Sequence, residues 1–237
     1  MSTSLQSYVD LPLIDISQFP SEFQYGGLKH LQYHPQIAAL TEGCTEWGFF
    51  AIVNHGIPVD LFQDLESVVR ELFAESEERA PTSNRAKGYF LTPWMESFSM
   101  SDLPDSHSYA VPEVSLKIYP TEGNSRDTIQ TYLSYMEDLT RRISKIVIAS
   151  LGLEVDTFYQ SDFEQCRASL RVNHYFSDGK SREDEQEVLY GHTDVNCFTI
   201  LYQDNNGGLQ IRSKEGEWMN VKPHSHSLVV NVGDCLK

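Results

Sequence analysis

The sequence predicts a mainly β fold in which helices come first and an all-β half follows. Apolar residues recur at helical spacing in three segments of the first two thirds of the chain. After Gln165 the period changes, and short alternating segments are separated by turn residues. Several short strands at this spacing favour a sandwich or barrel over a parallel α/β sheet. With 237 residues, the chain is long enough for one large domain or a barrel with helices attached.

The elements of the first part follow from its apolar pattern and its turn residues. In order, we expect a strand at 11–16, a helix at 35–47, a buried strand at 49–54, a helix from Pro58 and a helix at 127–151. Gly48 ends the first helix and Gly152 ends the last. Residues 75–114 are interrupted by Pro, Ser and Asp, so they are expected to wrap over the core as loops.

The second part is expected to contain only strands and turns. The expected strands are 167–176, 195–202, 209–212, 218–221 and 228–232. Turn residues separate them, most clearly the Asp-Asn-Asn-Gly-Gly run at 204–208 and the Lys-Glu-Gly run at 214–216. Trp47 and Trp218 are interpreted as core residues.

Composition limits the possible partners. The chain has 34 acidic and 18 basic side chains, a formal net charge of −16, so nucleic acid and anionic membranes are not expected as partners. The N-terminus lacks the pattern of a signal peptide, and no apolar run approaches the roughly 18 residues that a membrane span needs. The four cysteines are scattered, without a CxxC pair, and fit reduced, mostly buried thiols. A cytoplasmic protein is therefore expected.

One short motif suggests a metal site. His192 and Asp194 are two residues apart in a segment expected to be extended, where alternate side chains point to the same side. A histidine and a carboxylate are two of the three ligands of the facial triad that holds non-haem Fe(II) and leaves positions open for other ligands. The same pair also occurs by chance in surface turns, so its context has to decide.

Ordered motifs on both sides of this pair extend over essentially the whole chain. They are Leu11-Pro12-Leu13-Ile14-Asp15, Trp47-Gly48-Phe49-Phe50, Val53-Asn54-His55-Gly56-Ile57-Pro58, Leu170-Arg171-Val172-Asn173-His174-Tyr175, Thr199-Ile200-Leu201-Tyr202-Gln203, Gly207-Gly208-Leu209-Gln210-Ile211 and Val230-Asn231-Val232-Gly233-Asp234. In this order they are similar to the motifs of the plant-type, isopenicillin-N-synthase-like Fe(II)/2-oxoglutarate-dependent dioxygenases. The chain resembles that family.

The resemblance implies a double-stranded β-helix, or jelly-roll barrel, preceded by helices. It implies an N-terminal region at 1–160 and a partial jelly-roll domain at 161–237. It also implies that His192 and Asp194 bind Fe(II), and that Asn173 and Tyr175 hold the co-substrate 2-oxoglutarate. Without the resemblance, such a pair on a strand would be interpreted as packing and capping. The expected reaction consumes O₂, hydroxylates or desaturates a small organic metabolite, and releases succinate and CO₂. The complete protein is expected to be a monomer.

Other polar residues in these motifs are interpreted as structural. His55 belongs to a turn after a buried strand, and Asp234 to a turn near the barrel rim. His224 and His226 lie in a polar segment between two strands, where a solvated turn is the expected structure.

The chain departs from the family pattern near its end. In the family, a second histidine ligand and an Arg-x-Ser pair for 2-oxoglutarate follow the motif that ends here at Asp234, whereas this chain stops at Lys237. We therefore expect a C-terminally truncated member with an incomplete barrel and weakened iron binding, since affinity depends on the number of ligands.

Two alternatives to the oxygenase remain open. The first is an oxidase of the same fold that does not use 2-oxoglutarate, which succinate formation would distinguish. The second is a catalytically impaired family member that acts as a binding module, which the iron content of the purified protein would test.

Overall fold

The computed structural model describes residues 7–19, 34–79, 89–92, 94–103, 124–163, 166, 168–176 and 189–236. The chain divides into two compact units. The first comprises residues 1–57, 139–165 and 192–237, and the second comprises residues 58–138 and 166–191. The boundary expected between residues 160 and 161 stays a prediction.

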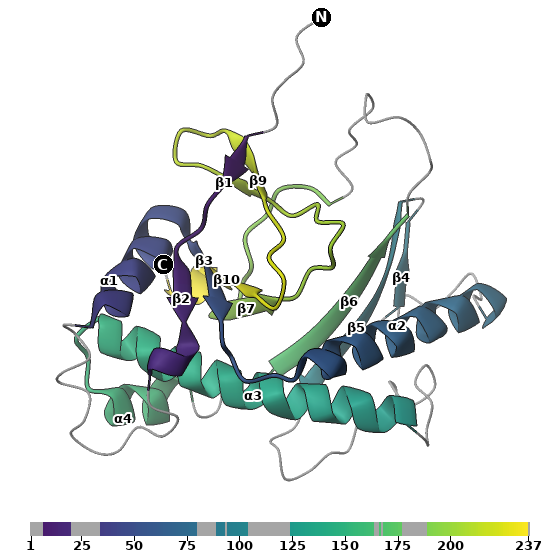
Figure 1. Cartoon of the computed structure of the whole chain (residues 1–237), viewed down its shortest axis with the longest axis horizontal. Coiled ribbons are helices and arrows are strands. Elements are labelled where there is room, and N and C mark those ends of the chain that lie inside the picture. Colours follow the sequence, from purple (N-terminus) through teal and green to yellow (C-terminus); the bar gives the residue numbers. More distant parts are fainter. Residues whose placement is uncertain are drawn as a thin grey trace, which may run out of the picture. The chain divides into compact units, whose positions relative to one another are not determined.

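A four-stranded sheet carries much of the core of the first unit (Figure 1). Its strand order is β2 (Leu13–Asp15), β3 (Phe49–Val53), β10 (Leu228–Val232) and β7 (Phe198–Leu201). β2 runs parallel to β3, and β10 runs antiparallel to β3 and β7. Phe50, Ile52 and Val230 expose 1% of their surface or less, because β3 and β10 have neighbours on both sides. All four strands lie within ranges expected from the sequence, so these four strand predictions are confirmed.

The helix before β3 is composite. α1 (Pro35–Glu42) continues as a π-helical turn, η3 (Gly43–Trp47). His34 caps its first turn by accepting a hydrogen bond from the Gln36 N–H at Nδ1, and Pro35 supplies a fixed φ at the first position. Gly48 then adopts a left-handed conformation with φ 68°, which glycine enters without steric cost, and the chain turns into β3. The expected helix and its end are confirmed.

A second sheet of the first unit has the order β1 (Tyr8–Val9), β9 (Trp218–Val221) and β8 (Gln210–Arg212). Val9, Ile211 and Val221 form a buried cluster with Val229, and Trp47 and Met219 are among the residues that pack against it. The prediction that Trp218 is a core residue is wrong, since its side chain is 47% exposed. Side chains alternate along β9, so Met219 and Val221 face the cluster while Trp218 points away.

Helix α3 (Asn124–Ser150) confirms the helix expected at 127–151. Its last twelve residues belong to the first unit, where Ile143 and Ile146 are almost completely buried. Arg142 donates hydrogen bonds of 2.7 Å to the carbonyl oxygens of Ile16 and Phe19, at the short helix η1 (Ile16–Gln18) that follows β2. α4 (Val155–Phe158) and a π-helical turn, η5 (Tyr159–Phe163), come next.

The second unit contains α2 (Val59–Arg79) and an antiparallel sheet of β4 (Tyr89–Leu91), β5 (Met95–Leu103) and β6 (Ala168–Tyr175). The helix from Pro58 and the strand at 167–176 are confirmed. The expectation of loops over 75–114 is wrong where the chain is described, because α2 continues to Arg79 and β4 and β5 are strands. Residues 104–114 lie outside the described residues. β5 is hidden in the sequence because Glu96 and Ser97 are buried beside Met95 and Phe98, which removes the alternation of polar and apolar residues.

The fold is mixed α/β, which corrects the expectation of a mainly β protein. Both long helices, α2 and α3, were expected, but with 21 and 27 residues they make up a large part of the fold, whereas β5, the longest described strand, has nine. The described strands form separate sheets of three, four and three strands, and no closed barrel is present among them.

Two further expectations concern membrane-spanning segments and the cysteines. None of the helices in the described ranges is long and apolar enough to cross a membrane. All four cysteines are described, and none forms a disulfide. The expectation that they are mostly buried is wrong for Cys166 and Cys235, which are exposed. Cys235 lies in the short helix η6 (Asp234–Leu236) after β10, whose residues are all exposed.

Candidate metal centre

His192 and Asp194 lie in the segment without regular secondary structure that leads into β7. Their side chains point to the same side, and the distance from His192 Nε2 to Asp194 Oδ1 is 3.6 Å. The histidine side chain is about half exposed and the aspartate side chain is 29% exposed. An imidazole nitrogen and a carboxylate oxygen at this separation can bind one metal ion, and the pair suits Fe(II), Mn(II) or Co(II).

The other oxygen of the Asp194 carboxylate is held by hydrogen bonds. Oδ2 accepts one from Thr199 Oγ1 at 2.5 Å and one from Asn231 Nδ2 at 2.9 Å. Thr199 lies on β7 and Asn231 on β10, so the sheet of the first unit sets the orientation of this carboxylate. Metal-binding carboxylates commonly have such partners, which the sequence motifs had not assigned.

The segment from 193 to 197 is joined to the residues that follow β10. Thr193 Oγ1 donates to Asp234 Oδ2 at 2.7 Å, and the Asp234 N–H donates to the Asp194 carbonyl at 2.8 Å. The Gly233 N–H donates to the Cys197 carbonyl at 2.9 Å. The sequence placed Asp234 in a turn with no role at the site. The structure places it in η6, against the segment that carries His192 and Asp194.

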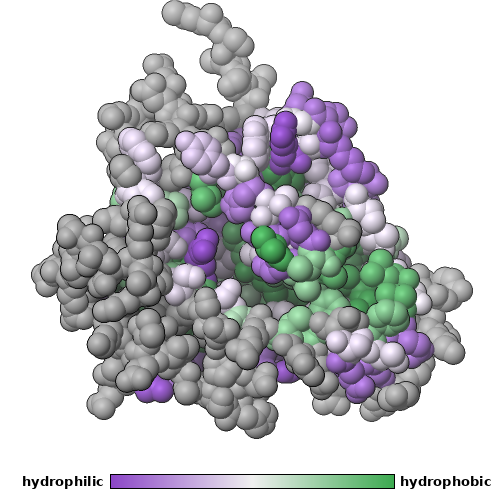
Figure 2. All heavy atoms as spheres, turned by 180° about the vertical axis from the view of Figure 1, so that it is seen from behind, coloured by the Kyte–Doolittle hydropathy of each residue, from purple (hydrophilic) through white to green (hydrophobic). Residues whose placement is uncertain are grey.

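The residues on both sides of the His192–Asp194 pair are open to solvent. Val195, which follows Asp194, is 81% exposed, and Tyr190, which precedes Gly191, is 79% exposed. Other large hydrophobic side chains also reach the surface, and Figure 2 shows hydrophobic residues gathered toward one side of the face that it draws. A solvent-exposed histidine and a half-buried carboxylate are accessible to a metal ion without any rearrangement of the core.

Asn173 and Tyr175, expected to hold 2-oxoglutarate, lie on β6 in the second unit. Burial raises the pKa of the Tyr175 phenol, while a hydrogen bond from the Asn173 side chain and the charge of Arg171 act in the opposite direction. The contact confirms that the two side chains share one face of the strand. A tyrosine phenol is protonated at neutral pH, so Tyr175 can donate a hydrogen bond to a carboxylate.

The remaining histidines of the motifs have structural surroundings. His55 is buried, and its Nδ1 accepts a hydrogen bond from the Ile57 N–H, so the ring supports the turn after β3. Burial lowers the pKa of His55; a backbone hydrogen bond with His226 raises it, and repulsion from the His226 side chain lowers it. His224 and His226 are exposed in the turn between β9 and β10, as the sequence predicted.

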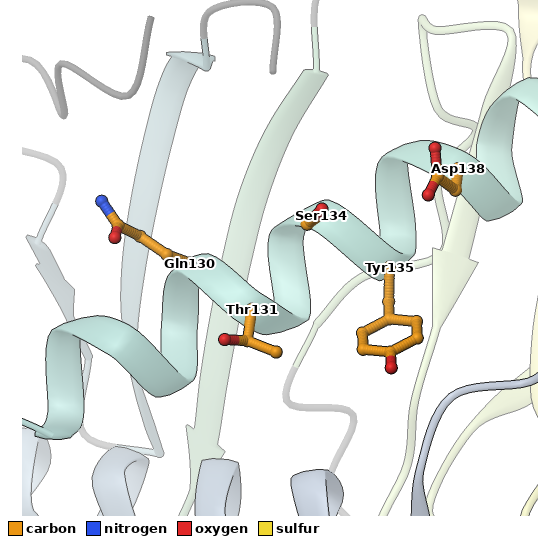
Figure 3. A pocket seen from close by; sticks show the side chains of 5 residues that line it. All are labelled: Gln130, Thr131, Ser134, Tyr135 and Asp138. Carbon is orange, nitrogen blue, oxygen red and sulfur yellow. The ribbon is translucent and has the colours of Figure 1, made fainter. Parts of the chain in front are cut away.

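The described residues do not form a complete metal cage. Within them, no group of three or more His, Cys, Asp or Glu side chains is arranged to hold a metal ion. A shallow hollow on the surface of α3, drawn in Figure 3, is lined by Gln130, Thr131, Ser134, Tyr135 and Asp138. None of these five residues was singled out by the sequence, and all five belong to the second unit.

Comparison with known proteins decides the family. Residues 166–237 match the model of the 2OG-Fe(II) oxygenase superfamily, and residues 11–85 match that of the non-haem dioxygenase N-terminal region named after morphine synthesis. A gibberellin 20-oxidase-like protein of Arabidopsis thaliana is 32% identical over 242 residues, which cover 96% of this chain and 70% of the relative. The chain belongs to the 2OG-Fe(II) oxygenase superfamily.

Further relatives in the 2OG-Fe(II) oxygenase superfamily have similar coverage. Gibberellin 3-beta-dioxygenase 2 of Arabidopsis thaliana is 31% identical over 95% of this chain and 63% of its own length. A crystal structure of JOX2 in complex with 2OG, Fe and JA superposes with a TM-score of 0.75 at 28% identity, over 100% of this chain and 68% of that one. The crystal structure of the rice dioxygenase for auxin oxidation superposes with a TM-score of 0.73 at 26% identity, over 96% of this chain and 72% of that one. The chain thus has the fold of these oxygenases and spans about two thirds of their length.

Proposed function

We propose that this chain is the iron-binding part of an Fe(II)- and 2-oxoglutarate-dependent oxygenase that hydroxylates or desaturates a small organic metabolite and releases succinate and CO₂. The observation that carries the proposal is the His192–Asp194 pair, with 3.6 Å between Nε2 and Oδ1 and with Oδ2 held by two donors. Membership of the 2OG-Fe(II) oxygenase superfamily supports it. We also propose that the strands of this chain are part of the jelly-roll barrel that the family resemblance implies.

The donor set fits the metal. A neutral imidazole and a carboxylate bind Fe(II) well, and the orientation of the carboxylate is maintained by two hydrogen bonds, as expected of a metal ligand. When bound, the iron would supply the oxidising chemistry on O₂ that no protein side chain can provide. The residues of this chain would hold the metal through His192 Nε2 and Asp194 Oδ1 and leave its other positions for small ligands.

Tyr175 and Asn173 have the chemistry to bind the co-substrate. The protonated phenol and the amide N–H₂ are hydrogen-bond donors from one face of β6, and Arg171 lies two residues before Asn173 on the same strand. Donors of this kind bind a carboxylate of a dicarboxylic acid such as 2-oxoglutarate. In this proposal Tyr175 and Asn173 orient 2-oxoglutarate and take no part in proton transfer.

Metal titration tests the first part. Fe(II) would be added to the purified 237-residue chain without oxygen, and binding measured by calorimetry. We expect one ion per chain, and a loss of affinity of about 100-fold or more in His192→Ala and Asp194→Ala, because each removes one of the protein ligands. His224→Ala, in an exposed turn, is the matched control and should bind like the unsubstituted chain. Equal affinity in His192→Ala would refute the assignment.

Product analysis tests the second part. Succinate formed from 2-oxoglutarate would be measured with Fe(II) and O₂ present, and Tyr175→Phe should raise the 2-oxoglutarate concentration needed for half-maximal formation. Iron binding without succinate formation would exclude the 2-oxoglutarate-dependent reaction for this chain and leave an oxidase or a binding module.

A further inference from the structure

The carboxylate of Asp194 is held at one oxygen by side chains from two different strands. Thr199 on β7 donates to Oδ2 at 2.5 Å, and Asn231 on β10 donates to the same atom at 2.9 Å. We propose that Thr199 and Asn231 are positioning residues that direct Asp194 Oδ1 toward the metal ion. This inference rests on the proposed function, because it assumes that Asp194 is a metal ligand.

The register of the sheet brings the two donors together. Asn231 is paired directly with Thr199 between the antiparallel strands β10 and β7. Directly opposite residues project from the same face of a sheet, so both side chains approach the carboxylate from one side. Val230, next to Asn231, is completely buried, so the strand that carries this donor is anchored in the core. The orientation of Asp194 is therefore set by the sheet, although Asp194 itself lies in an exposed segment.

A third side chain, Asn196, extends these hydrogen bonds into a chain. Asn196 Nδ2 lies 2.9 Å from Thr199 Oγ1. An ionised carboxylate can only accept, so the Thr199 hydroxyl must donate to Asp194, and its oxygen then accepts from the Asn196 amide. The result is a chain of donors from Asn196 through Thr199 to Asp194. The length of 2.5 Å is typical of a charge-assisted bond between a hydroxyl and a carboxylate, and successive bonds of this kind strengthen one another.

These bonds distinguish the two oxygens of Asp194. A carboxylate oxygen has about two lone-pair directions, and two donors occupy those of Oδ2. Oδ1 is the oxygen that faces His192 Nε2, at 3.6 Å. A metal ion between His192 and Asp194 would therefore be bound by the carboxylate through one oxygen. Without the two donors, the carboxylate could rotate about its terminal bond and present either oxygen or both.

A purely structural role makes a different prediction. If Thr199 and Asn231 only hold the ends of β7 and β10 together, their loss lowers the stability of the metal-free chain and leaves the affinity of the folded chain for metal unchanged. If they position Asp194, their loss lowers the affinity and changes the coordination of the metal, also in variants whose stability is nearly normal.

Cobalt(II) is a suitable probe, since it is stable in air and its visible spectrum reports its coordination. Affinity would be measured by calorimetry on the 237-residue chain, together with the absorption spectrum and the melting temperature without metal. Thr199→Val keeps the shape and removes the donor, Thr199→Ser keeps the hydroxyl, and Asn231→Ala removes the second donor. Thr41→Val is the matched control, because its hydroxyl bonds only the Ile37 carbonyl of α1, at 2.9 Å.

We expect Thr199→Val and Asn231→Ala to weaken Co(II) binding roughly 10- to 100-fold and to shift the Co(II) spectrum, as observed for other partners of metal ligands. Thr199→Ser and Thr41→Val should bind like the unsubstituted chain. If Thr199→Val does not fold, Asn231→Ala decides the question, with Thr41→Val as its control.

Two results would overturn the inference, and they can be told apart. Unchanged affinity and spectrum in Thr199→Val and Asn231→Ala, with binding intact in the unsubstituted chain, would refute the positioning role and leave the proposed function standing. No Co(II) or Fe(II) binding by the unsubstituted chain would overturn both.

Discussion

The backbone carbonyl of Asn196 occupies the space that a Cβ atom at Gly233 would need. Because the obstacle is backbone, it cannot move aside in the way that the end of a flexible side chain can. Gly233→Ala is therefore expected to push the segment 194–197 away from the end of β10. We expect it to lower the free energy of unfolding by about 1–3 kcal/mol or more, and to weaken metal binding by displacing Asp194. Urea unfolding and a Co(II) titration check the two effects.

Gly56→Ala is the control for the Gly233 prediction. Gly56 has a φ of 84°, but nothing lies within 4 Å of the position that a Cβ would take. This substitution introduces backbone strain of roughly 1–2 kcal/mol without overlap, and metal affinity should stay unchanged. A Gly233→Ala chain that binds Co(II) as tightly as Gly56→Ala would contradict the prediction.

Arg142 is expected to stabilise the first unit through the segment after β2. Its guanidinium donates to the carbonyls of Ile16 and Phe19, and burial lowers its pKa without removing its charge at neutral pH. Arg142→Met should lower the free energy of unfolding by about 2–4 kcal/mol, since hydrogen bonds from a charged group contribute about 1.5–3 kcal/mol each and part of this is lost to solvation.

Arg142→Lys separates charge from geometry. A lysine keeps the positive charge, but its shorter side chain does not place an N–H donor where Arg142 Nη2 donates to both carbonyls, so an intermediate loss is expected. Arg141→Met, at the next position of α3, controls for the removal of a basic side chain from this helix. If Arg141→Met and Arg142→Met were equally destabilising in urea, the two carbonyl contacts would not be the cause.

The elements that could be predicted from the sequence are those whose pattern is local. α1, α3 and β10 have regular apolar periods and clear turn residues at their ends, so their ranges were expected nearly as found. β5 could not be found in this way, because the buried Glu96 and Ser97 look like surface residues in the sequence. Glu96 is accommodated by His174 on the neighbouring strand, whose Nδ1 lies 2.8 Å from Glu96 Oε1. Such a partner 78 residues away leaves no local pattern.

The candidate site shows the same limit. His192 and Asp194 could be proposed from their spacing and from the motifs around them. The roles of Asn231 and Asp234 could not, because their hydrogen bonds to Asp194 and Thr193 span 37 and 41 positions of the chain. Thr199 is only five positions from Asp194, but its place beside Asn231 depends on the pairing of β7 with β10. Trp218 illustrates the converse error, since an aromatic residue in a strand can face outward when its neighbours face the core.

His55 predicts how stability depends on pH. Burial lowers the pKa of its imidazole, so the folded chain binds this proton less readily than the unfolded chain, whose histidines titrate near 6.5. The stability linked to His55 is thus fully present above about pH 6.5 and is lost as the pH falls toward the lowered pKa, by up to about 1.4 kcal/mol per pH unit. His55→Asn retains an acceptor for the Ile57 N–H and should flatten this part of the profile.

Urea unfolding between pH 5 and pH 8 measures the effect of His55→Asn. The difference in free energy of unfolding between the unsubstituted chain and the variant should shrink as the pH falls below 6.5, because only the unsubstituted chain loses this contribution. Parallel profiles for the two chains would show that His55 does not contribute to the pH dependence.

Cys44 is expected to react with alkylating reagents more slowly than the exposed Cys166. Burial raises its pKa to about 11, so only about one molecule in a thousand carries the reactive thiolate at pH 8. Cys166 is exposed and provides the comparison within the same chain. Mass spectrometry of peptides after timed treatment with iodoacetamide should show Cys166 modified at least about 10-fold faster than Cys44. In urea the two rates should converge, because unfolding removes the burial that protects Cys44, and similar rates in the folded chain would show that this thiol is accessible.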